Sequence, residues 1–80
     1  MTPVLTIDRV RAEIAELAGV STAEVTDEAN LMDLGLDSLR AMSLAERWMK
    51  AGVPVEFSEL AEEPTLRHWW SVLSRLSGGQ

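Results

Sequence analysis

The 80-residue sequence contains no cysteine and only one histidine, His68. Without cysteine the chain can form neither a disulfide framework nor a thiolate metal site, and one histidine cannot make a ligand cluster unaided. The lack of cysteine is also typical of a cytoplasmic protein. No apolar run approaches the roughly 20 residues that span a bilayer, and no secretory segment follows Met1, so we expect a soluble protein that has no membrane partner.

Basic residues are also scarce, with seven against thirteen acidic residues and a net charge of −6. This charge repels phosphate backbones and argues against nucleic acid as a partner. Between Glu13 and Asp37 there are seven carboxylates and no Lys or Arg. Such a run is usually a solvated face, but it can also form an acidic rim that attracts basic partner enzymes.

Apolar residues recur at helical spacing in three main segments and one short segment, and no strand pattern of useful length is present. This pattern predicts an all-α fold with helices at about residues 7–18, 38–50, 58–63 and 66–76. Thr6, Ser58 and Thr65 are the expected N-caps of the first, third and fourth helices, and Gly19 should end the first. The expected packing mass is aromatic and comprises Trp48, Trp69 and Trp70. His68 falls in the polar arc of the last helix, where we expect a solvated side chain.

The connection over residues 20–36 is long, which indicates that part of it is ordered. Ser21 and Glu24 have the spacing of a capping box and predict a single helical turn. Leucines then follow at intervals of two or three residues and should fix the loop to the core; they are Leu31, Leu34 and Leu36. A loop fixed in this way can orient a residue at its end.

Ser38 lies where this loop meets the second helix and is therefore expected to be exposed. Asp37 and Ser38 are both favoured N-cap types, so either could cap the helix. On a helical wheel, the core stripe is formed by Ala41, Leu44, Ala45 and Trp48, with Met42 and Met49 at its margin. Leu39 instead falls in the polar face beside the serine. It is either an ordinary exposed leucine or a contact point for a partner enzyme.

The residues offer little support for catalysis. A hydrolytic serine needs a base and an orienting group, and the chain has one histidine and no Gly-x-Ser-x-Gly elbow. No calcium-loop spacing or phosphate-cradling glycine loop is present either. We therefore expect no catalytic residue, no metal site and no enzymatic activity.

The string Gly35-Leu36-Asp37-Ser38-Leu39 resembles the attachment motif of the acyl, peptidyl and aryl carrier proteins. The resemblance covers nearly the whole chain and implies a single carrier domain over residues 1–80, folded as a four-helix bundle with a long first loop and a short third helix. It implies that a phosphopantetheinyl transferase attaches 4′-phosphopantetheine from coenzyme A to Ser38 with a magnesium ion. Asp37 would lie near that ion, and Gly35 belongs to the same motif. Cargo would then be held as a thioester on the thiol of the arm.

Within the family, Leu36 stands where peptidyl carriers usually have a second glycine. The segments Ala45–Lys50, Leu60-Ala61, Pro64-Thr65 and Trp69-Trp70 are similar to aryl carrier domains of siderophore-type nonribosomal peptide synthesis. This similarity implies salicylate or 2,3-dihydroxybenzoate as cargo, an aryl-acid adenylating ligase, and a downstream condensation or acyltransfer enzyme. It also implies a partner interface, in a protein that we expect to be monomeric, made of Leu39, Arg40, Met42, Phe57 and Ala61.

Two alternatives remain. One is a discrete acyl carrier protein of a polyketide or fatty-acid pathway. The other is an unmodified small helical interaction domain, in which Asp37 and Ser38 are only capping residues and the acidic run is a solvated face.

Overall fold

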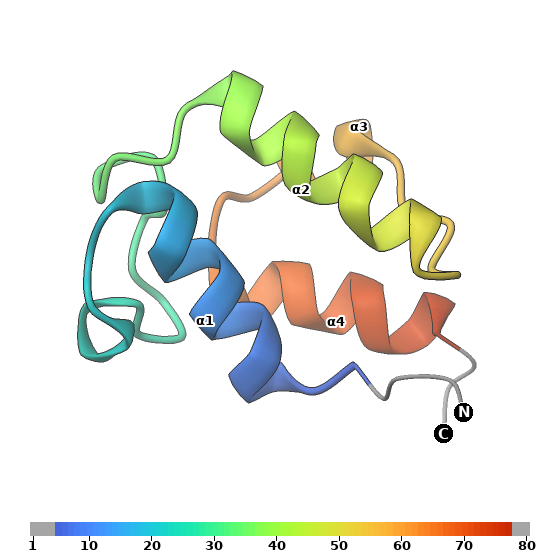
Figure 1. Cartoon of the computed structure of the whole chain (residues 1–80), viewed down its shortest axis with the longest axis horizontal. Helices are drawn as coiled ribbons and strands as arrows, with labels where there is room; N and C mark the ends of the chain where they lie inside the picture. The colour runs from blue at the N-terminus through green and yellow to red at the C-terminus, as the bar shows by residue number, and fades with distance from the viewer. Residues whose placement is uncertain (1–4, 78–80) are drawn as a thin grey trace.

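The computed structural model describes residues 5–77, which contain four α-helices, one 3₁₀ turn and no strand. The elements in chain order are α1 (Ile7–Ala18), η1 (Thr22–Glu24), α2 (Ser38–Lys50), α3 (Phe57–Ala61) and α4 (Leu66–Leu76). Helix α1 packs against α2 and α4, and the short α3 packs against the same two helices (Figure 1). The predicted all-α bundle with a long first loop and a short third helix is confirmed. Within residues 5–77, no helix has the length and apolar character needed to cross a membrane.

The ends of the main helices follow from local hydrogen bonds. The hydroxyl of Thr6 accepts a hydrogen bond from the backbone N–H of Arg9 at 3.1 Å and caps α1. The hydroxyl of Thr65 accepts from the N–H of His68 at 3.2 Å and caps α4. Gly19 follows the last residue of α1 in the left-handed conformation. These three residues act as the sequence predicted, because capping depends on contacts within a few residues.

Helix α3 differs from the prediction, since it runs from Phe57 to Ala61 instead of over residues 58–63. Ser58 is not its cap. The carboxylate of Glu59 reaches back to accept a hydrogen bond from the backbone N–H of Glu56 at 3.2 Å, which places Glu56 at the cap position. Phe57 is partly buried against the core at the first position of the helix. This short helix therefore begins where its aromatic side chain meets the core.

Two tryptophans dominate the core, as expected. Trp48 and Trp69 are fully buried, and their rings meet edge to face with centroids 6.2 Å apart. The indole N–H of Trp48 donates to the carboxylate of Glu13 at 3.0 Å, and that of Trp69 donates to the backbone oxygen of Leu60 at 2.8 Å. Each buried indole thus keeps a polar partner, which avoids the penalty of an unpaired buried donor. The second bond also fastens α3 to α4.

Three other residues of α4 can be compared with the predictions from the sequence, and one of them agrees. Trp70 is half-buried and packs against the core, in agreement with its expected place in the packing mass. Val72, which the sequence analysis did not assign to the core, is buried there. The prediction of a solvated His68 is wrong, because the side chain is partly buried and its Nε2 lies 2.8 Å from the backbone oxygen of Glu59. Helix α3 covers this side of α4, which a single helical wheel does not reveal.

Candidate cofactor attachment site

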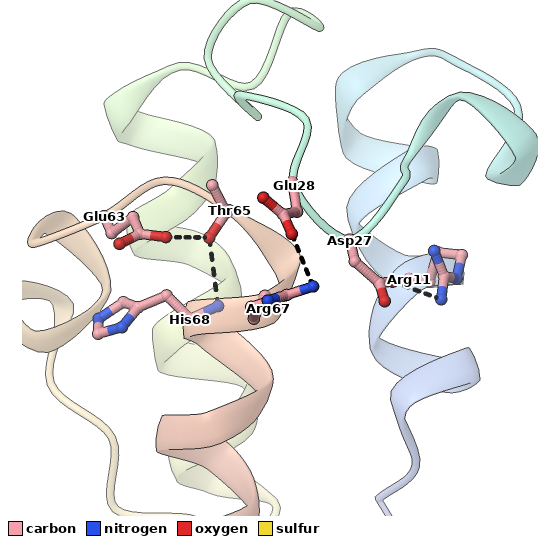
Figure 2. A network of polar contacts seen from close by, with 7 residues as sticks. All are labelled: Arg11, Asp27, Glu28, Glu63, Thr65, Arg67 and His68. Atoms are coloured by element: carbon pink, nitrogen blue, oxygen red, sulfur yellow. Dashed lines mark hydrogen bonds and ion pairs between the residues drawn. The ribbon is translucent and has the colours of Figure 1, made fainter.

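The first half of the long loop is held between α1 and α4, as Figure 2 shows. The guanidinium of Arg11 donates to Asp27 Oδ1 at 3.1 Å and also to the backbone oxygen of Val25. From the other side, the backbone N–H of Arg67 donates to the backbone oxygen of Asp27 at 2.9 Å. The guanidinium of Arg67 forms an ion pair with Glu28 at 2.6 Å. Two arginines from opposite ends of the sequence therefore order the same short segment.

The second half of the loop is held by apolar side chains. Leu31 and Leu36 are fully buried, and Leu34 is partly buried against the same core. The backbone N–H of Leu31 donates to the backbone oxygen of Pro64 at 2.8 Å, in the connection between α3 and α4. The N–H of Leu36 in turn donates to the oxygen of Leu31 at 3.2 Å. The prediction that leucines fix this loop is confirmed, and the residue that follows it is consequently well oriented.

Gly35 brings the loop against the end of α1. Its φ of +113° lies in a region that favours glycine, and a Cβ atom built there would be 3.0 Å from the backbone oxygen of Ala18. Both the conformation and the close approach therefore require glycine. The backbone conformation and the contact with α1 thus explain why the motif has glycine at position 35. Its contribution to cofactor binding stays a prediction.

Asp37 and Ser38 occupy different positions at the start of α2. Asp37 is the N-cap, and its Oδ1 accepts a hydrogen bond from the backbone N–H of Arg40 at 2.9 Å. Ser38 is the first residue of the helix and is exposed. Because Asp37 supplies the cap, the hydroxyl of Ser38 is not needed for that purpose.

This geometry fits a phosphate linked to Ser38. The serine stands on a helix of 13 residues, and a helix N-terminus bears partial positive charge. A negative group there gains about 0.3–1 kcal/mol at an exposed site. The helix start is also rigidly placed by the loop contacts, which suits the root of a mobile arm.

The residues predicted for a partner interface lie on two neighbouring helices. Leu39 and Met42 on α2 are 73% and 46% exposed, and Arg40 is exposed as well. Ala61 on α3 is exposed, whereas Phe57 on the same helix is partly buried against the core. Helices α2 and α3 pack against each other. The role of these five residues in partner binding stays a prediction.

Most of the acidic run between Glu13 and Asp37 makes internal contacts. Glu13 pairs with two arginines and accepts the hydrogen bond of an indole. The carboxylate of Glu24 accepts a hydrogen bond from the backbone N–H of Ser21 at 3.1 Å, which forms the predicted capping box. With the contacts described above, the members of the run in such contacts are Glu13, Glu24, Asp27, Glu28 and Asp37. Three of the seven carboxylates of the run, Glu13, Asp27 and Glu28, are paired with arginines, so the run carries less uncompensated negative charge than the sequence suggested.

Comparison with known proteins identifies a family. A protein-family model described as "Phosphopantetheine attachment site" matches residues 8–70. The chain is 43% identical over 74 residues to an isochorismatase of Bacillus subtilis, a stretch that covers 92% of this chain and 24% of that protein. It is 45% identical over 75 residues to the acyl carrier protein ScoB of Streptomyces coeruleorubidus, which covers 94% of this chain and 88% of that protein.

A third relative is the phenyloxazoline synthase MbtB of Mycobacterium tuberculosis, 45% identical over 69 residues. The match covers 86% of this chain but only 5% of the synthase, so the chain corresponds to a small part of two of these three relatives. No solved structure matches the chain significantly. Family members carry 4′-phosphopantetheine covalently on a serine. Since the match spans residues 8–70, the chain belongs to the phosphopantetheine attachment family of carrier domains.

Proposed function

We propose that Ser38 is the attachment point of 4′-phosphopantetheine and that residues 1–80 form one carrier domain. The proposal rests on the different positions that Asp37 and Ser38 occupy at the start of α2. Asp37 caps the helix through its bond to the N–H of Arg40, and Ser38 is exposed at the first helical position. The alternative in which Ser38 serves only as a cap loses its main support, because the cap is already supplied.

The residues around Ser38 hold the root of the arm and perform no chemistry in this proposal. When attached, 4′-phosphopantetheine supplies a thiol on which cargo is held as a thioester. Carrier domains of the family are generally non-catalytic, and we extend this to the whole chain. His68 supports the extension because its Nε2 is engaged with the backbone of α3. The domain would act in the cytoplasm as a monomer.

For the cargo, we propose an aryl acid of the salicylate or 2,3-dihydroxybenzoate type, carried for nonribosomal peptide assembly. The identity of 45% to the phenyloxazoline synthase supports this choice, since the name of that enzyme describes a product with a phenyl group. The partners would be a phosphopantetheinyl transferase, an aryl-acid adenylating ligase, and a condensation or acyltransfer enzyme that accepts the cargo.

A specific observation favours a second candidate. The acyl carrier protein ScoB is as similar to this chain as the synthase is, and the match covers 88% of its length. A discrete acyl carrier protein of a polyketide or fatty-acid pathway therefore remains the alternative to the aryl carrier.

The attachment is tested by incubating the protein with coenzyme A, magnesium and a broad-specificity phosphopantetheinyl transferase, followed by intact mass spectrometry. We expect one pantetheine adduct, absent from Ser38→Ala. The matched control is Ser43→Ala, which changes another exposed serine of α2 and should leave the adduct intact. An unmodified wild-type protein would instead support the small interaction domain, and an adduct that persists in Ser38→Ala would reject Ser38 as the attachment point.

The cargo is tested separately on the pantetheinylated protein. An aryl-acid adenylating ligase and an acyl-adenylating ligase are each supplied with salicylate, 2,3-dihydroxybenzoate and aliphatic acids, and thioester formation is measured by mass. Loading with an aryl acid is the expected result. Loading with aliphatic acids alone would reject the aryl assignment and favour the acyl carrier.

A further inference from the structure

The part of the long loop that leads into α2 forms one closed helical turn. The backbone N–H of Leu34 donates to the backbone oxygen of Leu31 at 3.2 Å. The N–H of Leu36 donates to the same oxygen at 3.2 Å, and the N–H of Gly35 donates to the oxygen of Met32 at 3.2 Å. These last two bonds, around a glycine with positive φ, form the Schellman motif that ends many helices. Leu31 and Leu36 are buried in one core cluster and supply the apolar pair that often accompanies this motif.

Asn30 closes the other end of this turn with its side chain. Its Oδ1 accepts a hydrogen bond from the backbone N–H of Met32 at 2.9 Å and another from that of Asp33 at 3.3 Å. These N–H groups belong to the second and third residues of the turn, which an N-cap side chain normally satisfies. Asn30 is exposed, so capping rather than core packing is the contribution of its side chain. The turn is therefore capped at both ends.

A turn this short depends on its caps. A single helical turn fixes several dihedral angles for very few hydrogen bonds and is unstable by itself. Leu31 and Leu36 anchor its two ends in the core, but Met32 is only partly buried between them and Asp33 is exposed. The conformation between the two anchors is therefore set mainly by hydrogen bonds, and Asn30 accepts two of them.

The capped turn lies directly before the proposed attachment point. Ser38 follows Leu36 by two residues and is the first residue of α2. The first residues of a helix have no intrahelical acceptor for their N–H groups, so their position depends on the segment that leads into the helix. Opening of the turn would consequently release the start of α2 and the serine with it.

We propose that Asn30 is a positioning residue for the modification of Ser38, because its side chain closes the turn that fixes the start of α2. The inference rests on the proposed attachment at Ser38. Asn30 does not touch the serine or the cofactor and acts only through the turn. Loss of its side chain lowers the fraction of molecules in which the serine is correctly placed, which lowers kcat. The value of KM should change little, because the surfaces of the helices stay the same.

The kinetic test compares variants of Asn30 with the loss of a distant cap. Asn30→Ala removes the oxygen that caps the turn, and Thr6→Ala removes the oxygen that caps α1, neither with a change of charge. A broad-specificity phosphopantetheinyl transferase with coenzyme A and magnesium is the probe, and kcat and KM are measured for the unmodified protein. We expect Asn30→Ala to lower kcat about three- to tenfold with KM within about twofold of wild type. Thr6→Ala should remain within about twofold of wild type in both constants.

Conservative variants test whether the capping oxygen is responsible. Asp and Ser cap helices about as well as Asn, so Asn30→Asp and Asn30→Ser should both keep kcat within about twofold of wild type. One of these variants adds a negative charge and the other does not, which separates capping from charge.

Hydrogen exchange of the unmodified protein gives a readout that does not depend on the transferase. In Asn30→Ala the amides of Gly35 and Leu36 should exchange about fivefold faster, although their own acceptors are intact, because the turn opens as a unit. Amides inside α2, such as that of Leu44, should change no more than they do in Thr6→Ala. Thermal unfolding establishes that every variant is folded at the assay temperature.

Four results would overturn the positioning role while the attachment at Ser38 stands. They are a wild-type kcat in Asn30→Ala, an equal fall of kcat in Thr6→Ala, a fall that neither conservative variant restores, and unchanged exchange of Gly35 and Leu36. Absence of any adduct on the wild-type protein would instead reject the attachment at Ser38 and, with it, the role of Asn30 in that reaction.

Discussion

Substitution of Gly35 by alanine tests whether the approach of the loop to α1 fixes the start of α2. We expect this substitution to lower the free energy of unfolding in two separate ways. At φ +113° a residue with a side chain is strained, which costs about 1–3 kcal/mol. The added Cβ would also lie 3.0 Å from the backbone oxygen of Ala18, closer than an ordinary van der Waals contact. Overpacking of this kind costs about 1–3 kcal/mol more, because backbone must move on one side of the contact.

Gly52→Ala is the matched control that separates the two penalties. Gly52 has a similar φ of +104°, but a Cβ there would meet nothing within 4 Å. This variant should therefore show the strain alone, and Gly35→Ala should be less stable than Gly52→Ala by about 1–3 kcal/mol. A small domain with a total stability of about 5–15 kcal/mol would lose a substantial fraction of it in Gly35→Ala.

Urea unfolding followed by tryptophan fluorescence measures this difference, since Trp48 and Trp69 are buried and become exposed on unfolding. Under native conditions, Gly35→Ala should also slow pantetheinylation of Ser38 more than Gly52→Ala does, because only Gly35 lies in the loop that leads to the serine. Equal unfolding free energies for the two variants would refute the argument that contact with Ala18 positions the loop.

The remaining predictions separate structural from functional roles at the site. Asp37→Asn should keep the cap and stay within about 0.5 kcal/mol of wild type, whereas Asp37→Ala should lose about 1 kcal/mol in urea unfolding. Both should slow modification of Ser38, since the charge that would face the magnesium ion is absent; normal kinetics in Asp37→Asn would disprove that role. Met42→Asp and Phe57→Asp should both slow transfer to partners. Only Phe57→Asp should lower the unfolding temperature clearly, because Phe57 is partly buried. If Phe57→Asp lowers the free energy of unfolding as much as Trp69→Ala does, by about 3–5 kcal/mol, Phe57 belongs to the core and not to the partner interface.

Helix positions were predictable from the sequence where the evidence is local. Thr6 and Thr65 cap α1 and α4 by hydrogen bonds to residues three positions later. The spacing of Ala41, Leu44 and Trp48 placed the buried side of α2 correctly. It also placed Leu39 in solvent, where it is 73% exposed. Each of these inferences requires only the geometry of one helix.

One prediction failed at a local contact within α3, and another failed because a neighbouring helix covers the residue. Glu56 is not a favoured N-cap type, and it occupies the cap of α3 because Glu59 reaches back to its N–H. His68 looked solvated on its own helix, but α3 brings the carbonyl of Glu59 within 2.8 Å of its ring. Neither contact can be obtained from the periodicity of a single segment.

The charge of the long loop also could not be predicted, because the sequence shows the carboxylates but not the arginines with which they form ion pairs. Arg11 precedes Asp27 by 16 residues, and Arg67 lies much further along the chain from Glu28, yet both pairs form in the structure (Figure 2). The contacts that order the loop therefore also neutralise charges that would otherwise attract basic partners. In contrast, two of the three cations of α2, Arg40 and Lys50, form no ion pair within residues 5–77. The number of carboxylates in the sequence therefore does not give the charge that this loop presents to solvent, because the ion pairs that hold the loop also compensate part of that charge.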